Sequence, residues 1–264
     1  MSERTVTDLI SLRGRVALIT GATGHLGRAM AAALAEAGAS VVASSRRIDD
    51  ARAVADHLPR VDGARHHAVA IDHMEEASVA SGLKAAIESA GRIDVLVANG
   101  HEPLVSDWRA VTAEQFNRQL MNATGYFLLA RLTRDHLVAR GAGGSIVLLG
   151  SMYGVVGSYP DAYEGIGPAN PVAYQALKAG IVQMARHLAV YWAKDRVRVN
   201  CLSPGPFPSD AAPAGLVARL ERKCPMGRIG QPDELKGPLV FLASDASSYM
   251  TGQNLLIDGG WTAW

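Results

Sequence analysis

Seven short apolar runs recur along the chain and alternate with longer stretches that favour helix. The runs are residues 15–20, 40–44, 67–71, 93–98, 145–149, 197–202 and 254–258. Their apolar residues are largely consecutive instead of alternating with polar ones, which is typical of strands buried on both faces of a parallel sheet. The pattern therefore predicts about seven strands.

Helices are predicted between these strands, and glycines close two of them. The helical stretches are residues 28–37, 51–58, 75–90, 113–140, 171–194 and 233–243. Gly38 and Gly91 stand where a helix C-terminus favours glycine. Strand and helix alternate over residues 1–264 without a linker or repeat, so we expect one doubly wound α/β domain, a Rossmann fold with helices on both faces of a parallel sheet.

Polar residues and a glycine directly follow several of the predicted strands. Gly21 follows the first strand, Asp72 the third, Asn99 the fourth, Ser151 the fifth and Ser203 the sixth. In parallel sheets of this kind, ligands bind at the carboxyl ends of the strands. We therefore expect the functional site along this edge.

A glycine-rich turn joins the first strand to the first helix. Gly21, Gly24 and Gly27 allow a tight turn, close approach of the backbone to a pyrophosphate, and close helix–strand packing. The following helix N-terminus favours phosphate charge. The spacing is Gly-x-x-Gly-x-x-Gly, not the usual Gly-x-Gly-x-x-Gly, and no P-loop sequence is present. The turn predicts a dinucleotide cofactor; a tight turn that binds nothing is the alternative.

The end of the second strand bears on the choice between NAD and NADP. An acidic residue there bonds the ribose hydroxyls, whereas an arginine accommodates a 2′-phosphate. The segment reads Ser45-Arg46-Arg47, with no carboxylate before Asp49. We therefore expect NADP(H) to be preferred. If both arginines are only solvated loop charges, NAD(H) remains possible.

Tyr174 and Lys178 lie four residues apart in a predicted helix, so their side chains share one face. A phenol has an unperturbed pKa of roughly 10, and a neighbouring ammonium lowers that pKa. Ser151 could hold a carbonyl oxygen beside the phenol. The three side chains predict a general acid/base site for interconverting a carbonyl and an alcohol. Taken alone, the Tyr-x-x-x-Lys pair would be an ordinary helix surface.

Charge, cysteine content and hydropathy limit the kinds of binding partner and the cellular location that we expect for this protein. The net charge of +1 gives no electrostatic footprint for nucleic acid or an anionic membrane. Cys201 and Cys224 do not make a disulfide framework, and no cysteine or histidine cluster has zinc spacing, so no metal is expected. The N-terminus has no apolar signal segment, and no run is long enough for a membrane span. We expect a cytoplasmic protein with a small-molecule substrate.

Several segments occur in an order that is specific to one family. They are residues 12–16 and 20–27, Asp72, residues 121–125, Ser151, Tyr174, Lys178, residues 198–200 and 203–205, and residues 258–261. In this order they resemble the short-chain dehydrogenase/reductase family, in its short single-domain branch, over nearly the whole chain. The resemblance implies an NAD(P)(H)-dependent oxidoreductase that interconverts a ketone and a secondary alcohol.

The resemblance also implies roles for individual residues. Tyr174 is the general acid in reduction and the base in oxidation, Lys178 lowers its pKa and bonds the nicotinamide ribose, and Ser151 holds the substrate oxygen. Asn122 would support a water near Lys178. The implied cofactor-binding residues are Gly21, Thr23, Gly24, His25, Leu26, Gly27, Ser45, Arg46, Asp72, His73, Asn99, Gly100, Tyr174, Lys178, Pro204, Gly205 and Phe207.

Three departures from the family pattern stand out. Gly24 comes one place earlier than in most single-domain members, a spacing commoner in the epimerase/dehydratase branch. The usual Asn-Asn-Ala-Gly is Ala-Asn-Gly-His101, which puts a ring either against substrate or in a solvated loop. Ser151 and Tyr174 are 23 positions apart, longer than usual. We expect residues 152–173 to be an extended substrate loop; they resemble a subgroup associated with flagellin-glycan and nonulosonic-acid sugars, which favours a polar, sugar-like substrate.

Two other functions fit the same fold. A sugar-nucleotide epimerase or dehydratase shares the Tyr/Lys pair but normally needs a larger C-terminal region, and an NADP-binding sensor usually loses the tyrosine or serine. The family usually forms homotetramers or homodimers through the helices that carry Asn122 and Tyr174 and through the C-terminal segment. Trp261 and Trp264 fit a terminus buried either between subunits or within one.

Overall fold

The computed structural model describes residues 3–104, 106–166 and 171–264. Seven parallel strands form one sheet in the order β3-β2-β1-β4-β5-β6-β7. The strands are β1 (Val16–Ile19), β2 (Ser40–Ser45), β3 (His67–Ala70), β4 (Val95–Ala98), β5 (Gly144–Leu149), β6 (Val197–Pro204) and β7 (Asn254–Ile257). The predicted seven-stranded parallel sheet is confirmed.

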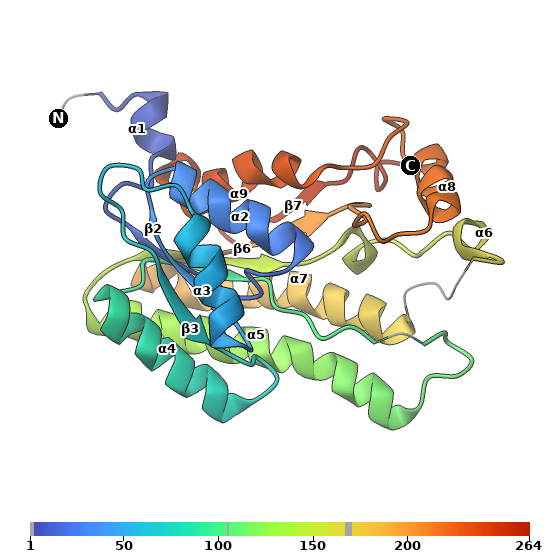
Figure 1. Cartoon of the computed structure of the whole chain (residues 1–264), viewed down its shortest axis with the longest axis horizontal. Helices are drawn as coiled ribbons and strands as arrows, with labels where there is room; N and C mark the ends of the chain where they lie inside the picture. The colour runs from blue at the N-terminus through green and yellow to red at the C-terminus, as the bar shows by residue number, and fades with distance from the viewer. Residues whose placement is uncertain (1–2, 105, 167–170) are drawn as a thin grey trace.

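Helices cover both faces of the sheet (Figure 1). On one face α4, α5 and α7 lie side by side, and on the other α2 packs against α9. The six predicted helices correspond to α2 (His25–Glu36), α3 (Ile48–His57), α4 (Glu76–Ala90), α5 (Ala113–Ala139), α7 (Val172–Trp192) and α9 (Lys236–Ala243). Three further helices were not predicted: α1 (Val6–Ile10), α6 (Pro160–Tyr163) and α8 (Ala214–Lys223).

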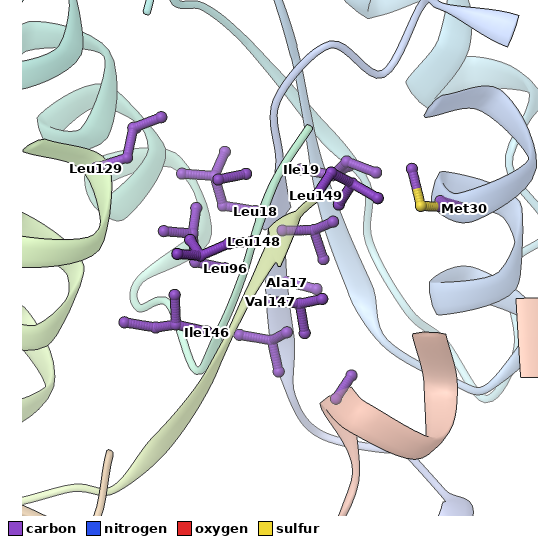
Figure 2. Packing of buried hydrophobic residues seen from close by; sticks show 14 of the residues in the cluster. Ala17, Leu18, Ile19, Met30, Leu96, Leu129, Ile146, Val147, Leu148 and Leu149 are labelled. Carbon is purple, nitrogen blue, oxygen red and sulfur yellow. The ribbon is translucent and has the colours of Figure 1, made fainter. Parts of the chain in front are cut away.

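The central strands are apolar on both faces because each face meets a helix layer. In Figure 2, Leu18 and Leu96 point toward Leu129 of α5, whereas Ile19 points the other way, toward Met30 of α2. All five side chains are fully buried. This two-sided burial explains why these strands read as continuous apolar runs in the sequence.

The strand order reverses between β1 and β4. The chain runs outward through β2 and β3 and returns through α4 to place β4 beside β1. Asn99, just after β4, donates from its amide to the carbonyl oxygens of Thr20 and Gly21, each at 3.1 Å. These bonds fix the turn after β1 at the point where such sheets bind ligands. In the part of the chain that the structure describes, no helix is long and apolar enough to cross a membrane.

The inserted residues after Ser151 pack into a small second cluster with the end of the chain. Trp261 is 1% exposed and meets Tyr153 and Tyr159 edge-on, with ring centroids 6.5 and 5.3 Å away. Asp161 of α6 pairs with Lys223 of α8 at 2.6 Å. Trp261 is therefore buried within one chain. Trp264, in contrast, is exposed.

Candidate active site

Two of the three glycines in the first turn are required by the packing of this chain. Gly21 has a φ of +62°, and a Cβ there would lie 2.9 Å from the Cα of Gly100. A Cβ at Gly27 would lie 2.0 Å from the carbonyl oxygen of Gly21. A Cβ at Gly24 would make only an ordinary contact of 3.4 Å with that oxygen. The protein therefore leaves the space beside Gly24 open to a bound group.

A cleft of about 1250 Å³ begins at this turn and reaches the ends of β2, β3 and β4. Gly24 caps α2 without a side-chain bond, and the first turn of α2 carries no acidic residue. The helix N-terminus therefore presents uncompensated positive charge to the cleft. The predicted cofactor residues Thr23, His25, Leu26, Ser45, Arg46, Asp72 and His73 also line it. A dinucleotide with its pyrophosphate at the turn fits these residues.

The two arginines after β2 differ in their surroundings. Arg47 makes a bidentate ion pair with Asp50, at 2.7 and 2.9 Å. Arg46 is exposed and lines the cleft, and within the described part of the chain no carboxylate pairs with it. The guanidinium of Arg46 is thus available to an anionic ligand, whereas that of Arg47 is already paired with Asp50 of α3.

A second cavity of about 250 Å³ lies where β5, α7 and the end of β6 meet. It is lined by Leu26, Asn99, His101, Leu149, Gly150, Ser151, Tyr174, Lys178, Pro204, Gly205 and Phe207. Three of the four predicted catalytic side chains therefore face one space. Lys178 Nζ lies 5.6 Å from the centroid of the Tyr174 ring and donates a hydrogen bond of 2.8 Å to the Leu149 carbonyl.

Burial is the main influence on the pKa values of Tyr174 and Lys178, the predicted acid/base pair. Burial raises the pKa of Tyr174, with a hydrogen bond from Ser151 acting in the lowering direction. Burial lowers the pKa of Lys178 to about 8. The expected lowering of the Tyr174 pKa by Lys178 is therefore not seen in the protein alone, because loss of solvent around the phenol outweighs other influences. Tyr174 is protonated at neutral pH and still partly exposed at the cavity, as a general acid requires.

The side-chain amide of Asn122, on α5, is hydrogen-bonded to other groups of the protein. Its Oδ1 accepts hydrogen bonds from His73 Nε2 and the Glu102 amide N–H, both at 2.8 Å. Its Nδ2 donates to the carbonyl oxygens of Glu102 and Gln119, at 3.2 and 2.9 Å. These four bonds use both donors and both acceptor positions of the amide. The side chain of Asn122 therefore fixes the loop after β4, and the support of a water near Lys178 by this residue stays a prediction.

Two residues of α5 near the site were missed in the sequence. Gln119 Nε2 lies 3.4 Å from His101 Nε2, and the buried ring of Tyr126 has its centroid 5.8 Å from Lys178 Nζ. Both share the inward face of α5 with Asn122, because their spacings of three and four residues are one helical turn. That spacing was the available signal.

A family model described as enoyl-(acyl carrier protein) reductase matches residues 21–262. This match covers most of the chain and shows the family. The chain belongs to the short-chain dehydrogenase/reductase family. The resemblance seen in the sequence is thereby confirmed.

Relatives of known activity extend over nearly the whole chain. Cis-4-hydroxycyclohexanecarboxylate dehydrogenase of Sinomonas cyclohexanicum is 36% identical, covering 94% of this chain and 97% of its own. NADP-dependent mannitol dehydrogenase of Alternaria alternata is 34% identical, with 96% and 94% covered. The crystal structure of a gluconate 5-dehydrogenase from Burkholderia cenocepacia, in complex with NADP and tartrate, has a TM-score of 0.88 at 29% identity, with 98% and 100% covered.

Membership of the short-chain dehydrogenase/reductase family fixes the reaction class. The chain is an NAD(P)(H)-dependent oxidoreductase that interconverts a ketone and a secondary alcohol. This confirms the reaction predicted from Ser151, Tyr174 and Lys178.

Proposed function

We propose that this oxidoreductase prefers NADP(H) and acts on a polyol- or sugar-like substrate, with Tyr174 as its general acid/base. The observation that carries the proposal is the cavity of about 250 Å³ that Ser151, Tyr174 and Lys178 share. The mannitol dehydrogenase relative and the tartrate bound to the gluconate 5-dehydrogenase support a substrate rich in oxygen. The more specific likeness to flagellin-glycan and nonulosonic-acid enzymes stays a prediction.

Each side chain of the cavity has a distinct task. Ser151 donates a hydrogen bond to the reacting oxygen, and Tyr174 gives that oxygen a proton in reduction and removes it in oxidation. Lys178, charged at neutral pH with a pKa of about 8, stabilises the phenolate left behind. The nicotinamide cofactor supplies or accepts the hydride when bound. Asn122 positions the loop that forms one wall.

Different groups of residues are proposed to hold successive parts of the cofactor. Glycine-turn residues and α2 take the pyrophosphate, Asp72 and its neighbour His73 lie at the adenine end, and the end of β6 lies at the nicotinamide end. The full proposed set is Gly21, Thr23, Gly24, His25, Leu26, Gly27, Ser45, Arg46, Asp72, His73, Asn99, Gly100, Tyr174, Lys178, Pro204, Gly205 and Phe207; all of these line one of the two cavities.

Arg46 is the proposed determinant of NADP preference, since its guanidinium is available to the 2′-phosphate. The purified protein should oxidise polyols such as mannitol and threitol with NADP⁺ and reduce ketoses with NADPH. Arg46→Ala should weaken NADPH binding roughly tenfold or more and leave NADH binding little changed. Arg47→Ala, at a neighbouring arginine of the same cleft that is already paired with Asp50, is the matched control.

Different outcomes of this experiment refute different parts of the proposal. Tighter binding of NADH than NADPH, or indifference of NADPH binding to Arg46→Ala, contradicts the cofactor preference. Turnover confined to apolar ketones contradicts the substrate class.

The organisation and assembly of the chain are further parts of the proposal. We take residues 1–264 as one domain with the site built in and residues 152–173 as the substrate loop; its residues 167–170 lie outside the described ranges. Exposed apolar side chains of α7, among them Val190 and Tyr191, support a homodimer or homotetramer formed through α5 and α7 in the cytoplasm. Sedimentation as a monomer would contradict the assembly.

A further inference from the structure

One partly buried histidine at the active site has no task in the chemistry described above. His101 follows β4 and lines both the cofactor cleft and the catalytic cavity. Its ring lies edge-on to that of Tyr174, with centroids 5.5 Å apart and planes at 79°. The family's usual Asn-Asn-Ala-Gly segment has glycine at this place. The imidazole is therefore a feature that this chain adds beside its general acid.

The imidazole of His101 is neutral over the working pH range of most enzymes. Burial lowers its pKa to about 3, and the nearby Lys178 ammonium and His73 act in the same direction, against Glu102. A neutral imidazole has one nitrogen that donates a hydrogen bond and one that accepts. It can therefore bind an uncharged substrate group without changing the charge balance around Lys178.

Gln119 orients this ring. The Gln119 side chain is 2% exposed, and its Nε2 lies 3.4 Å from His101 Nε2. As the Gln119 amide is oriented in the structure, its Nε2 donates to His101 Nε2, and the ring proton is assigned to Nδ1 from this contact. Within the described part of the chain, no hydrogen bond engages Nδ1. In this assignment Nδ1 is a donor without a partner among the described residues, on a ring that lines the cavity with Tyr174.

We propose that His101, oriented by Gln119, donates a hydrogen bond to a substrate oxygen on the carbon next to the reacting carbonyl, and so selects hydroxy ketones and vicinal diols over plain ketones. The proposal rests on the proposed function, because Tyr174 must hold the reacting oxygen. A neighbouring hydroxyl lies about 3 Å from that oxygen, within reach of a ring packed against Tyr174. A plain ketone leaves the donor unpaired, which a polar site discriminates against.

Hydroxyacetone and butanone test this selection, because they differ by exchange of a hydroxyl for a methyl group. Reduction of each with NADPH is measured as kcat/KM. The wild type should favour hydroxyacetone roughly ten- to hundredfold. In His101→Leu, which has no donor, the ratio should fall to near one, and His101→Gln, which retains a donor, should recover part of it. Gln119→Leu should lower the ratio less.

Controls separate selection from damage. His57→Leu changes an exposed histidine of α3 and should leave the ratio unchanged. NADPH dissociation constants and unfolding temperatures of the variants show whether the fold and the cleft survive. If the wild type reduces both ketones equally, or if His101→Leu keeps the wild-type ratio, the role of His101 is wrong and the proposed function stands. If the wild type reduces neither, both fail.

Discussion

Lys178 keeps an ammonium group in a site where only 5% of the residue is exposed, with one hydrogen bond, to Leu149. Such burial disfavours the charged form and destabilises the folded chain. Its folded-state pKa of about 8 lies below the unfolded value of 10.5, so between these values the unfolded chain binds more protons. Wild-type stability should therefore rise as the pH increases from about 8 to 10.5 through this group.

Lys178→Met should make the protein inactive but more stable. Removing the buried charge should raise the free energy of unfolding at pH 7 by roughly 1–3 kcal/mol, because a methionine of similar length fills the space and carries no charge. The variant should also lack the rise above pH 8. Urea unfolding at pH 7 and pH 10 measures both effects, with the exposed Lys194→Met as control. A Lys178→Met protein less stable than the wild type would show that burial of this charge is not costly.

At the scale of elements, the turn between β1 and α2 combines two kinds of glycine. Gly27 lets the first turn of α2 lie against the backbone of Gly21, as the 2.0 Å approach of a Cβ shows. A Cβ at Gly24 would fit within the chain, so we expect the glycine there to leave room for a bound cofactor. Spacing alone could not separate these two roles.

Gly27→Ala and Gly24→Ala should therefore affect different properties. Gly27→Ala should destabilise the fold by more than about 2 kcal/mol, because backbone atoms must move. Gly24→Ala should change stability by less than about 1 kcal/mol and weaken NADPH binding by roughly tenfold or more. Chemical denaturation and a fluorescence titration distinguish the two. Equal destabilisation by both variants would contradict the division of roles.

Elements with a strong local pattern could be predicted from sequence, and those stabilised by distant contacts could not. The central strands were found because both of their faces are buried, and α7 was found with Tyr174 and Lys178 on one face. α6 and α8 were missed, since α6 is short and they are joined to each other by contacts such as that between Asp161 and Lys223. Asn122 was named in the sequence, but its hydrogen bonds to His73 and Glu102 could not be predicted, because these partners lie between β3 and α4 and in the loop after β4.

At the scale of the whole molecule, the sheet brings residues from most of the chain to one edge. The glycine turn after β1, His101 after β4, Ser151 after β5 and Tyr174 on α7 meet only because the strands are parallel. The ends of the apolar runs in the sequence therefore predict the sheet edge at which the two cavities lie. The protonation state of Tyr174 cannot be predicted in this way, because it depends on burial contributed by the surrounding elements.

The central claim is that Tyr174 is the proton donor and acceptor for a carbonyl held in this cavity. The most direct test compares NADPH-dependent reduction of hydroxyacetone and of ketoses by the wild type and Tyr174→Phe, with the exposed Tyr249→Phe as control. We expect Tyr174→Phe to lower kcat by roughly 100- to 10,000-fold and to weaken NADPH binding far less, because Tyr174 is one of many residues proposed to hold the cofactor. A Tyr174→Phe protein with the wild-type rate would contradict the mechanism.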